Sequence, residues 1–238
     1  MWKGIPASAG VGMGRAAVLR EPCLDYAHVV PAGPGEEKAR LAAGVRAAVG
    51  RTQAMAEAMN AKVGARQADI LRGQAAMLTD PFFRSQAEQR IDGGACAEAA
   101  ADAVCQGFIA MFSALEDELM RQRATDIGDI RVRLLEILLG RAGADLGALP
   151  DGSVLVVRDL TPSMTAALDP RHVRGIVTES GGVTSHSAIL ARALAVPAVL
   201  SVDGATTLVG DGVTVVVDGT KGIVLADPSP GQLQAYGL

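Results

Sequence analysis

The sequence predicts a discontinuous α/β domain interrupted by an all-α helical bundle. Between residues 35 and 140, Ala, Leu, Met, Arg, Glu and Gln dominate and β-branched residues are few, which is typical of helices. After Pro150 the composition changes to valine-rich runs that end in Gly, Asp or Pro, as strands do. Residues 1–20 are again extended and interrupted by glycines. We therefore expect residues 1–32 and 146–238 to form one α/β domain, with a bundle of residues 33–145 inserted between them.

Glycine and proline divide the central part into separate helices. Breaks occur near Gly64, Pro81 and Gly93. Short connections between helices of this length favour antiparallel packing in a bundle. The predicted helices cover residues 36–59, 65–79, 96–115 and 118–139, with a further short helix over 82–91.

The C-terminal part alternates short strands with a helix. Residues 219–222 read Gly-Thr-Lys-Gly and predict a hairpin turn between two strands. A helix over 186–194 lies between two other strands and makes a βαβ-like unit, so that the loop before the helix lies at the end of a strand. The predicted strands cover 16–19, 154–160, 173–178, 199–202, 213–218 and 223–226.

One histidine, His186, stands where a glycine turn becomes an apolar helix. Gly181 and Gly182 permit positive φ and close backbone approach, and Thr184 or Ser185 can cap the helix. Free N–H groups and the helix dipole at this end favour an anion, and they favour the neutral form of the imidazole ring near pH 7. A lone histidine at a helix start is more often a cap or a surface residue, so the position alone leaves both interpretations open.

These residues could support phosphoryl transfer. A histidine that carries a phosphoryl group needs an unprotonated ring nitrogen and donors for three phosphoryl oxygens. His186 is the candidate nucleophile, and Gly182, Thr184 and Ser185 are the candidate phosphate-binding residues. The two hydroxyls could equally serve only as helix caps.

The run from Gly181 to Arg192, followed by Leu194 and residues 197–199, resembles the phosphohistidine signature of Enzyme I of the phosphoenolpyruvate-dependent sugar phosphotransferase system. The similar signatures of phosphoenolpyruvate synthase and pyruvate phosphate dikinase usually have cysteine where this chain has Ser185. Three further landmarks resemble Enzyme I in the same order along the chain, so that the resemblance covers almost the whole sequence. They are residues 4–14, residues 126–131 with Leu134 and Leu135, and residues 159–165.

The resemblance implies a swivelling phosphohistidine α/β domain that carries an inserted bundle for binding the histidine phosphocarrier HPr. It implies that His186 receives a phosphoryl group from phosphoenolpyruvate and passes it to HPr, feeding sugar uptake. Thr165 matches a family threonine that hydrogen-bonds the active histidine and biases its tautomer. Spacing alone would make Thr165 a turn or helix-start residue after Pro162. We expect no cofactor or metal in this chain, because Mg²⁺ belongs to the barrel that binds phosphoenolpyruvate in the family.

Two departures from the family pattern bear on the partner and the donor. The second helix and its following turn are acid-rich in Enzyme I. This chain has Arg72 and Gln74 there, and residues 79–84 include one acid. The identity of the phosphocarrier is therefore left open. Phe82 and Phe83 in that turn could be core residues or an exposed contact patch. The chain also ends where the family's barrel begins. We therefore expect a fragment or a truncated relative, able to take phosphate from a phosphorylated carrier but not from phosphoenolpyruvate.

Other functions remain as alternatives to Enzyme I. The chain could be the phosphotransfer module of a dihydroxyacetone kinase system, or a non-enzymatic module that binds a phosphocarrier without turnover. It could also be the central domain of a phosphoenolpyruvate synthase or dikinase, but Ser185 and the inserted bundle argue against that.

Composition excludes several classes of function. The net charge is -4 and the basic residues are scattered, so nucleic-acid binding is not expected. The first residues lack a basic region followed by an apolar stretch and no long apolar stretch occurs, so neither a signal peptide nor a membrane span is expected. The cysteines Cys23, Cys96 and Cys105 have no metal-ligand spacing. The expected location is the cytoplasm, away from membranes.

His28 and His172 are expected on the surface. Arg192 lies about 240° round the helix from His186 and is expected to be solvated or to reach a partner's acid.

Overall fold

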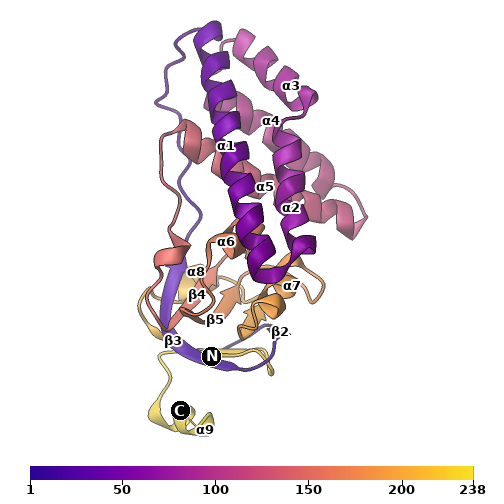
Figure 1. Cartoon of the computed structure of the whole chain (residues 1–238). Coiled ribbons are helices and arrows are strands. Elements are labelled where there is room, and N and C mark those ends of the chain that lie inside the picture. The colour runs from indigo at the N-terminus through magenta and orange to yellow at the C-terminus, as the bar shows by residue number, and fades with distance from the viewer. Residues whose placement is uncertain (238) are drawn as a thin grey trace. The chain divides into compact units, whose positions relative to one another are not determined.

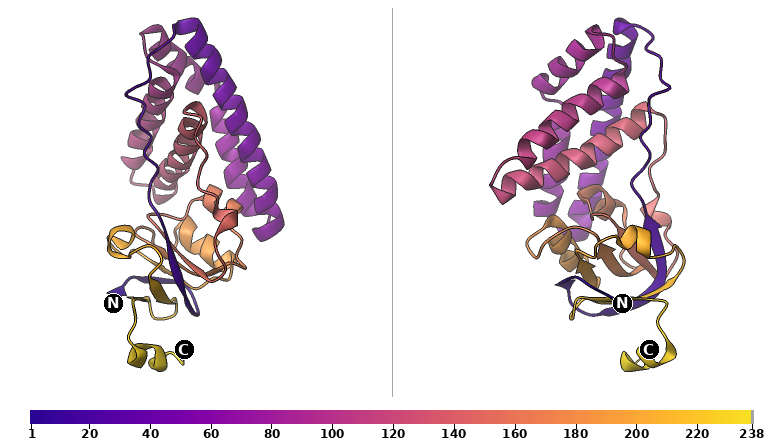
Figure 2. Two further views of the ribbon diagram at one scale, coloured as in Figure 1. Left: turned by 90° about the vertical axis from the view of Figure 1, so that its left-hand side faces the viewer. Right: turned by 180° about the vertical axis from the view of Figure 1, so that it is seen from behind.

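The computed structural model (Figure 1) describes residues 1–237, apart from the side chains of residues 118 and 119, and divides into two compact units. One unit joins Met1–Glu21 to the chain from Ala144 onward, and the other is Pro22–Gly143. The described residues nearest both ends of the chain belong to the first unit (Figure 2). The predicted class, an α/β domain carrying an inserted bundle, is confirmed. The first boundary is corrected, because it falls after Glu21 and not after residue 32.

Polar contacts explain this correction. The Tyr26 hydroxyl donates to the Asp102 carboxylate at 2.5 Å, and the Ala32 N–H donates to Glu37 at 3.1 Å. Burial, together with the Asp102 carboxylate, raises the pKa of Tyr26 to about 12. The segment before the first helix is therefore fastened to the bundle by side chains of α1 and α4, which no periodicity in its own sequence could indicate.

The bundle contains α1 (Pro34–Val63), α2 (Ala65–Leu78), α3 (Pro81–Asp92), α4 (Ala97–Ser113) and α5 (Glu118–Leu138). All were predicted, including the short α3. Asp80 caps α3 by accepting a hydrogen bond from the Phe82 N–H at 2.7 Å, and Pro81 follows at the first helical position. Helices α1 and α2 lie side by side in both views of Figure 2.

The bundle core is apolar and contains small residues. Leu41, Phe83, Val104 and Leu134 come from α1, α3, α4 and α5 and lie in one buried cluster. Cys105 belongs to the same cluster, and burial raises the pKa of its thiol to about 12, so the thiol stays protonated and unreactive. The buried Cys96 and the exposed Cys23 are also free thiols.

A polar network crosses the bundle between α1, α2 and α5. The Arg133 guanidinium donates to Thr52 at 2.6 Å, to the Gln74 amide oxygen at 3.4 Å and to the Asp129 carboxylate at 3.2 Å. The Gln74 amide nitrogen also donates to Asp129 at 3.2 Å. All of these side chains are buried. The network therefore satisfies charges and amides that would be costly in an apolar interior.

Asp126, which precedes this network on α5, gives a pH-dependent prediction. Its burial, reinforced by Asp129 and opposed by Arg123, raises its pKa from 3.8 to about 7. The folded state thus keeps a proton that the unfolded chain loses, and the stabilisation present at low pH is lost as the pH rises from about 4 to about 7. Replacing Asp126 with Asn should remove this loss, which is on the order of a few kcal/mol. Urea unfolding of both chains should show a larger advantage for the Asn variant at pH 8 than at pH 4. An advantage that is constant with pH would contradict the assignment.

The α/β unit is built on a mixed sheet in the order β1-β8-β7-β3-β4-β5-β6-β2. The neighbours β3, β4, β5 and β6 are parallel, and the remaining pairs are antiparallel. The two edge strands, β1 and β2, are separated only by Gly4, so the two edges of the sheet come together. The strands are β1 (Trp2–Lys3), β2 (Ile5–Ser8), β3 (Val11–Leu19), β4 (Ser153–Val157), β5 (Val173–Thr178), β6 (Ala198–Leu200), β7 (Thr214–Asp218) and β8 (Ile223–Ala226).

Most predicted features of this sheet are present. The hairpin turn over residues 219–222 joins β7 to β8, with Gly222 at φ 69°. Strand β3 is longer than the predicted 16–19, and β4 ends at Val157, so that residues 158–160 form a loop instead of a strand. The sequence did not predict β1 or β2, or the short helices α8 (Ala205–Leu208), α9 (Pro230–Ala235) and η1 (Leu146–Ala148), because each is too short to show periodicity. Helix α6 (Pro162–Ala167) lies where the spacing after Pro162 suggested a turn or a helix start.

Among the described residues, no helix is both long enough and apolar enough to cross a membrane.

Candidate active site

His186 is the first residue of helix α7 (His186–Ala193), which follows β5 and leads to β6. Strands β5 and β6 are parallel, which confirms the predicted βαβ unit. Ser185 caps the helix by accepting a hydrogen bond from the Ala188 N–H at 3.3 Å. Leu190 is buried and anchors the helix, while His186 itself is half-buried. The fold therefore holds the imidazole at a helix N-terminus and leaves part of it accessible.

The glycine turn before the helix uses only one of its glycines for backbone freedom. Gly181 has φ 107°, and a Cβ there would approach the Ser185 hydroxyl to 3.0 Å. Gly182 has no such φ, and a Cβ there would meet nothing within 4 Å. Of the two glycines, only Gly181 therefore uses the positive φ that glycine permits, and the lack of a side chain at Gly182 keeps the space beside the loop open.

The carbonyl groups of this loop are held from inside the protein. The Gly181 carbonyl accepts a hydrogen bond from the Ser201 hydroxyl at 2.7 Å, and the Gly182 carbonyl accepts one from the Ser185 N–H at 3.0 Å. The Ser180 carbonyl accepts one from the Thr178 hydroxyl. Ser201 has a φ of 55°, a left-handed backbone conformation that costs a non-glycine residue roughly 1–2 kcal/mol. Strain of this kind persists where the surrounding structure needs the side chain in place.

The N–H groups of the same loop differ from its carbonyl groups in their hydrogen bonding. Gly181, Gly182 and Val183 donate no hydrogen bond from their N–H groups to any residue that the structure describes. Successive backbone donors of this kind next to a helix N-terminus form an anion-binding site. The loop thus offers donors for an anion a few residues before His186.

A second segment is fastened to the helix that carries His186. The Ser187 hydroxyl donates to the Asp159 carboxylate and, at 3.4 Å, to the Leu160 carbonyl. Helix α6, which begins after Thr161, contacts α7. Residues 159–165 and 181–192, which were singled out separately in the sequence, therefore lie together in one site.

Thr165 is completely buried within α6. Its hydroxyl donates to the Thr161 carbonyl at 3.1 Å, one helical turn earlier. The position beside α7 suits an orienting residue, and the hydroxyl oxygen keeps lone pairs that can accept a hydrogen bond. Its role toward His186 stays a prediction.

The other histidines lie outside this site. His28 is exposed, and the Nε2 atom of His172 lies 3.3 Å from the exposed Asp151. Asp159, Ser187 and Ser201 were not predicted as site residues from the sequence. The only signal for the first two was their presence within resembling motifs, and Ser201 gave none, because its role depends on a positive φ and a contact across the sheet.

Phe82 and Phe83 have different environments. Phe83 is 4% exposed and belongs to the bundle core, whereas Phe82 is 58% exposed. The Phe82 ring lies 6.0 Å from that of Phe108 on α4. Met111, three residues after Phe108 in α4, is also exposed, as is Leu115 just beyond the end of that helix. We use the name α3–α4 patch for the exposed Phe82, Met111 and Leu115 together with the half-buried Phe108.

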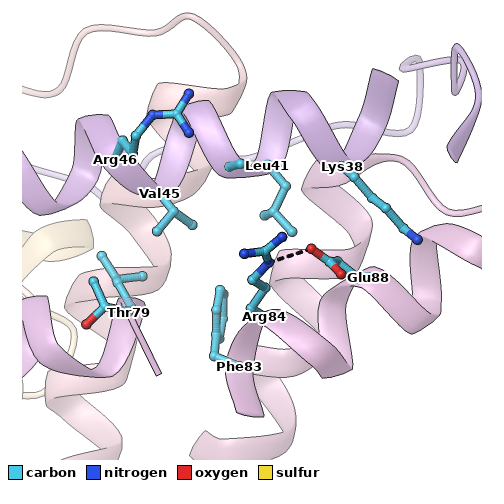
Figure 3. A pocket seen from close by; sticks show the side chains of 10 residues that line it. Lys38, Leu41, Val45, Arg46, Thr79, Phe83, Arg84 and Glu88 are labelled. Carbon is cyan, nitrogen blue, oxygen red and sulfur yellow. Dashed lines mark hydrogen bonds and ion pairs between the residues drawn. The ribbon is translucent and has the colours of Figure 1, made fainter. Parts of the chain in front are cut away.

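A cavity of about 240 Å³ lies between α1, the end of α2 and α3 (Figure 3). Leu41, Val45 and Phe83 provide its apolar wall. Two of the cations that line it are paired, Arg84 with Glu88 at 2.6 Å and Lys38 with Asp92 at 2.7 Å. None of the predicted site residues lines this cavity, so it is not part of the His186 site.

No group of three or more histidine, cysteine, aspartate or glutamate side chains suited to a metal ion occurs within the described part of the chain.

Comparison with known proteins defines the class to which this fold and site belong. Residues 3–123 match the family model of the N-terminal domain of PEP-utilising enzymes, and residues 149–222 match that of their mobile domain. The chain therefore belongs to the PEP-utilising enzymes and corresponds to the N-terminal part of Enzyme I, as the individual relatives show.

Similar curated proteins are phosphoenolpyruvate-protein phosphotransferases. The chain is 37% identical to that of Geobacillus stearothermophilus over 98% of its own length and 40% of the relative's. It is 34% identical to that of Bacillus subtilis over 98% of its length and 41% of the relative's. The chain thus spans about two fifths of the length of these relatives.

Solved structures agree with this placement. A solution structure of Enzyme I matches all of this chain and 97% of that chain, with a TM-score of 0.75 and 30% identity. The N-terminal domain of a nitrogen-type Enzyme I matches with a TM-score of 0.64 and 27% identity, over all of this chain and 98% of that chain.

Proposed function

We propose that His186 accepts and donates a phosphoryl group as the relay of a phosphoenolpyruvate-dependent phosphotransferase. The observation that carries the proposal is a half-buried histidine at a helix N-terminus, three residues after the last of the successive N–H groups of residues 181–183, which lack a partner among the described residues. A neutral ring nitrogen attacks phosphorus, the N–P bond forms, and the bond from phosphorus to the donor breaks with its electron pair leaving on the donor. The relatives' name supplies phosphoenolpyruvate as the donor of the full-length enzyme.

Each site residue has a defined part in this proposal. The N–H of Gly182, with those of its neighbours, donates to the phosphoryl oxygens and stabilises the charge that develops on them. The Ser185 hydroxyl caps α7 and so fixes the helix start, and the exposed Thr184 supplies a further hydroxyl for the phosphoryl group. Thr165 orients the imidazole from α6. Phosphoenolpyruvate and its Mg²⁺ would be bound by a part of the enzyme beyond the region that these relatives share with the chain.

The acceptor that fits best is a histidine phosphocarrier of the HPr type, docked on the α3–α4 patch. Exposed apolar residues in a contiguous patch mark protein interaction surfaces. Glu116 and Asp117 follow Leu115 directly and are exposed. The chain thus carries acids after its fourth helix, whereas its second helix is poor in acids relative to Enzyme I. An apolar patch with acids at its edge suits a carrier whose contact face is basic. This function places the protein in the cytoplasm, where such a carrier would meet it.

Transfer of acid-labile label from a phosphorylated HPr to the purified chain tests the proposal. The wild-type chain should become labelled, and the His186→Ala variant should not, whereas the His172→Ala variant should label as the wild type does. Label that persists in His186→Ala would reject His186 as the relay. A chain that binds the carrier and never becomes labelled would be a binding module instead. Incubation with phosphoenolpyruvate and Mg²⁺ alone should give no label.

The two neighbouring phenylalanines provide a test of the docking patch. Phe82→Ala removes an exposed ring, so we expect it to raise the KM for the phosphorylated carrier about tenfold with almost no change in stability. Phe83→Ala removes a buried ring and should destabilise the chain by about 3–5 kcal/mol. Labelling rates over a range of carrier concentrations and urea unfolding of both variants distinguish these effects. An unchanged KM in Phe82→Ala would place the carrier elsewhere.

A further inference from the structure

We propose that Arg192 is a positioning residue that holds the loop before His186 in the geometry required for phosphoryl transfer. The proposal rests on the proposed function of His186 and adds to it a second residue, which touches neither the imidazole nor the phosphoryl group. It concerns the carbonyl side of the loop, whereas the phosphoryl group is bound on the N–H side.

The contacts of Arg192 are with the backbone. Its Nη2 atom donates to the Val183 carbonyl at 3.1 Å, and its Nη1 atom donates to the Ala7 carbonyl at 3.4 Å. Ala7 lies in β2, which pairs with β6 at the edge of the sheet, and α7 contacts β2. One guanidinium therefore joins the loop, the helix and an edge strand.

Arg192 completes a pattern along the loop. The three preceding carbonyls already accept hydrogen bonds, from Thr178, Ser201 and the Ser185 N–H, and Arg192 supplies the bond to the fourth. Because each peptide unit is planar, fixing a carbonyl also fixes the N–H of the next residue. The bond to the Val183 carbonyl thus sets the direction of the Thr184 N–H, and the Ser201 bond does the same for the Gly182 N–H.

The chemistry of the contact requires arginine. Two carbonyls in two different elements need two donors at a fixed separation, which the planar guanidinium provides and a single ammonium group does not. Arg192 is placed about 240° round α7 from His186, so the same side chain does not reach the imidazole along the helix surface. From the sequence, Arg192 was expected to be solvated or to contact a partner's acid. The backbone contacts give it a different role.

The test compares Arg192→Ala and Arg192→Lys with Arg174→Ala, which removes an exposed arginine side chain of β5 that makes no hydrogen bond with the described residues. Label transfer from phosphorylated HPr to His186 is followed at varied carrier concentration. We expect Arg192→Ala to lower the maximal rate about 10–100-fold with an unchanged KM, because loss of loop geometry acts on the transfer step. Arg192→Lys should recover little of the rate, and added guanidinium ion should recover part of it in Arg192→Ala only.

Amide hydrogen exchange measured by NMR gives a readout that does not depend on transfer. In Arg192→Ala the amide of Thr184 should change in exchange rate and chemical shift, while amides of the sheet and the thermal midpoint stay as in Arg174→Ala. A full rate in Arg192→Ala, an unaltered loop, or equal activity in Arg192→Lys would each overturn the proposal. If the wild-type chain never becomes labelled, the proposed function of His186 fails, whereas the exchange data still decide whether Arg192 positions the loop.

Discussion

Replacing Arg133 with alanine is expected to destabilise the chain by about 3–5 kcal/mol, a large part of the total stability of an ordinary domain. The guanidinium is buried and donates to groups on α1, α2 and α5, namely Thr52, Gln74 and Asp129. Removing it leaves the Asp129 carboxylate buried without its cation, close to the buried Asp126 on the same helix. The cost therefore comes mainly from a charge left without compensation and not from the lost packing of one side chain.

Urea unfolding at pH 8 measures this effect, and a second variant isolates its cause. Arg133→Met with Asp129→Leu removes both charges and keeps the volume filled, so it should be much less destabilising than Arg133→Ala. Arg84→Ala, at an exposed pair with Glu88, should change the unfolding free energy by less than about 1 kcal/mol. If the single and double variants at Arg133 were equally unstable, the network would contribute through packing alone.

Replacing Gly12 with alanine is expected to be similarly damaging to the α/β unit. A Cβ at this position would lie 1.6 Å from the Arg174 carbonyl oxygen, a backbone atom that cannot rotate away. Gly12 lies within β3, paired with Val217 of β7, so the strand cannot shift without breaking its ladder. We expect a loss of about 3 kcal/mol or more, at the upper end of what overpacking causes.

A second glycine provides a control of opposite sign. Gly50 is exposed within α1, and a Cβ there would meet nothing within 4 Å. Gly50→Ala should therefore stabilise the chain by about 1 kcal/mol, because alanine restricts the unfolded backbone and favours the helix. Thermal unfolding of the two variants should shift the midpoint in opposite directions. A tolerated Gly12→Ala would show that β3 does not approach β5 as closely as the structure indicates.

Sequence patterns predicted the longer elements of this fold well. The bundle helices and the strands β5, β7 and β8 appear close to their expected ranges, since each is long or apolar enough to show its period. The predictions failed where long-range contacts decide. The segment containing Tyr26 was assigned to the α/β domain because its sequence is not helical, yet its hydroxyl is held by Asp102 of the bundle.

Part of the candidate site was predictable because its residues are neighbours in the chain. Glycine, cap and histidine are neighbours in the chain, so local conformation brings Gly181, Ser185 and His186 together without help from the rest of the molecule. The contacts that hold them come from elsewhere. Asp159 reaches Ser187 from the loop after β4, and Ser201 reaches the Gly181 carbonyl from the end of β6.

The sequence by itself determined that a histidine begins a helix after a glycine turn, and that helical and strand-forming parts alternate along the chain. These properties follow from the conformational preferences of neighbouring residues. Only the tertiary structure decided which side chains bond to the loop carbonyls, which loop N–H groups are left without a partner in the described structure, and that Phe82 is exposed while Phe83 is buried. Those outcomes depend on hydrogen bonds and packing between residues far apart in sequence, whose energies local patterns do not encode.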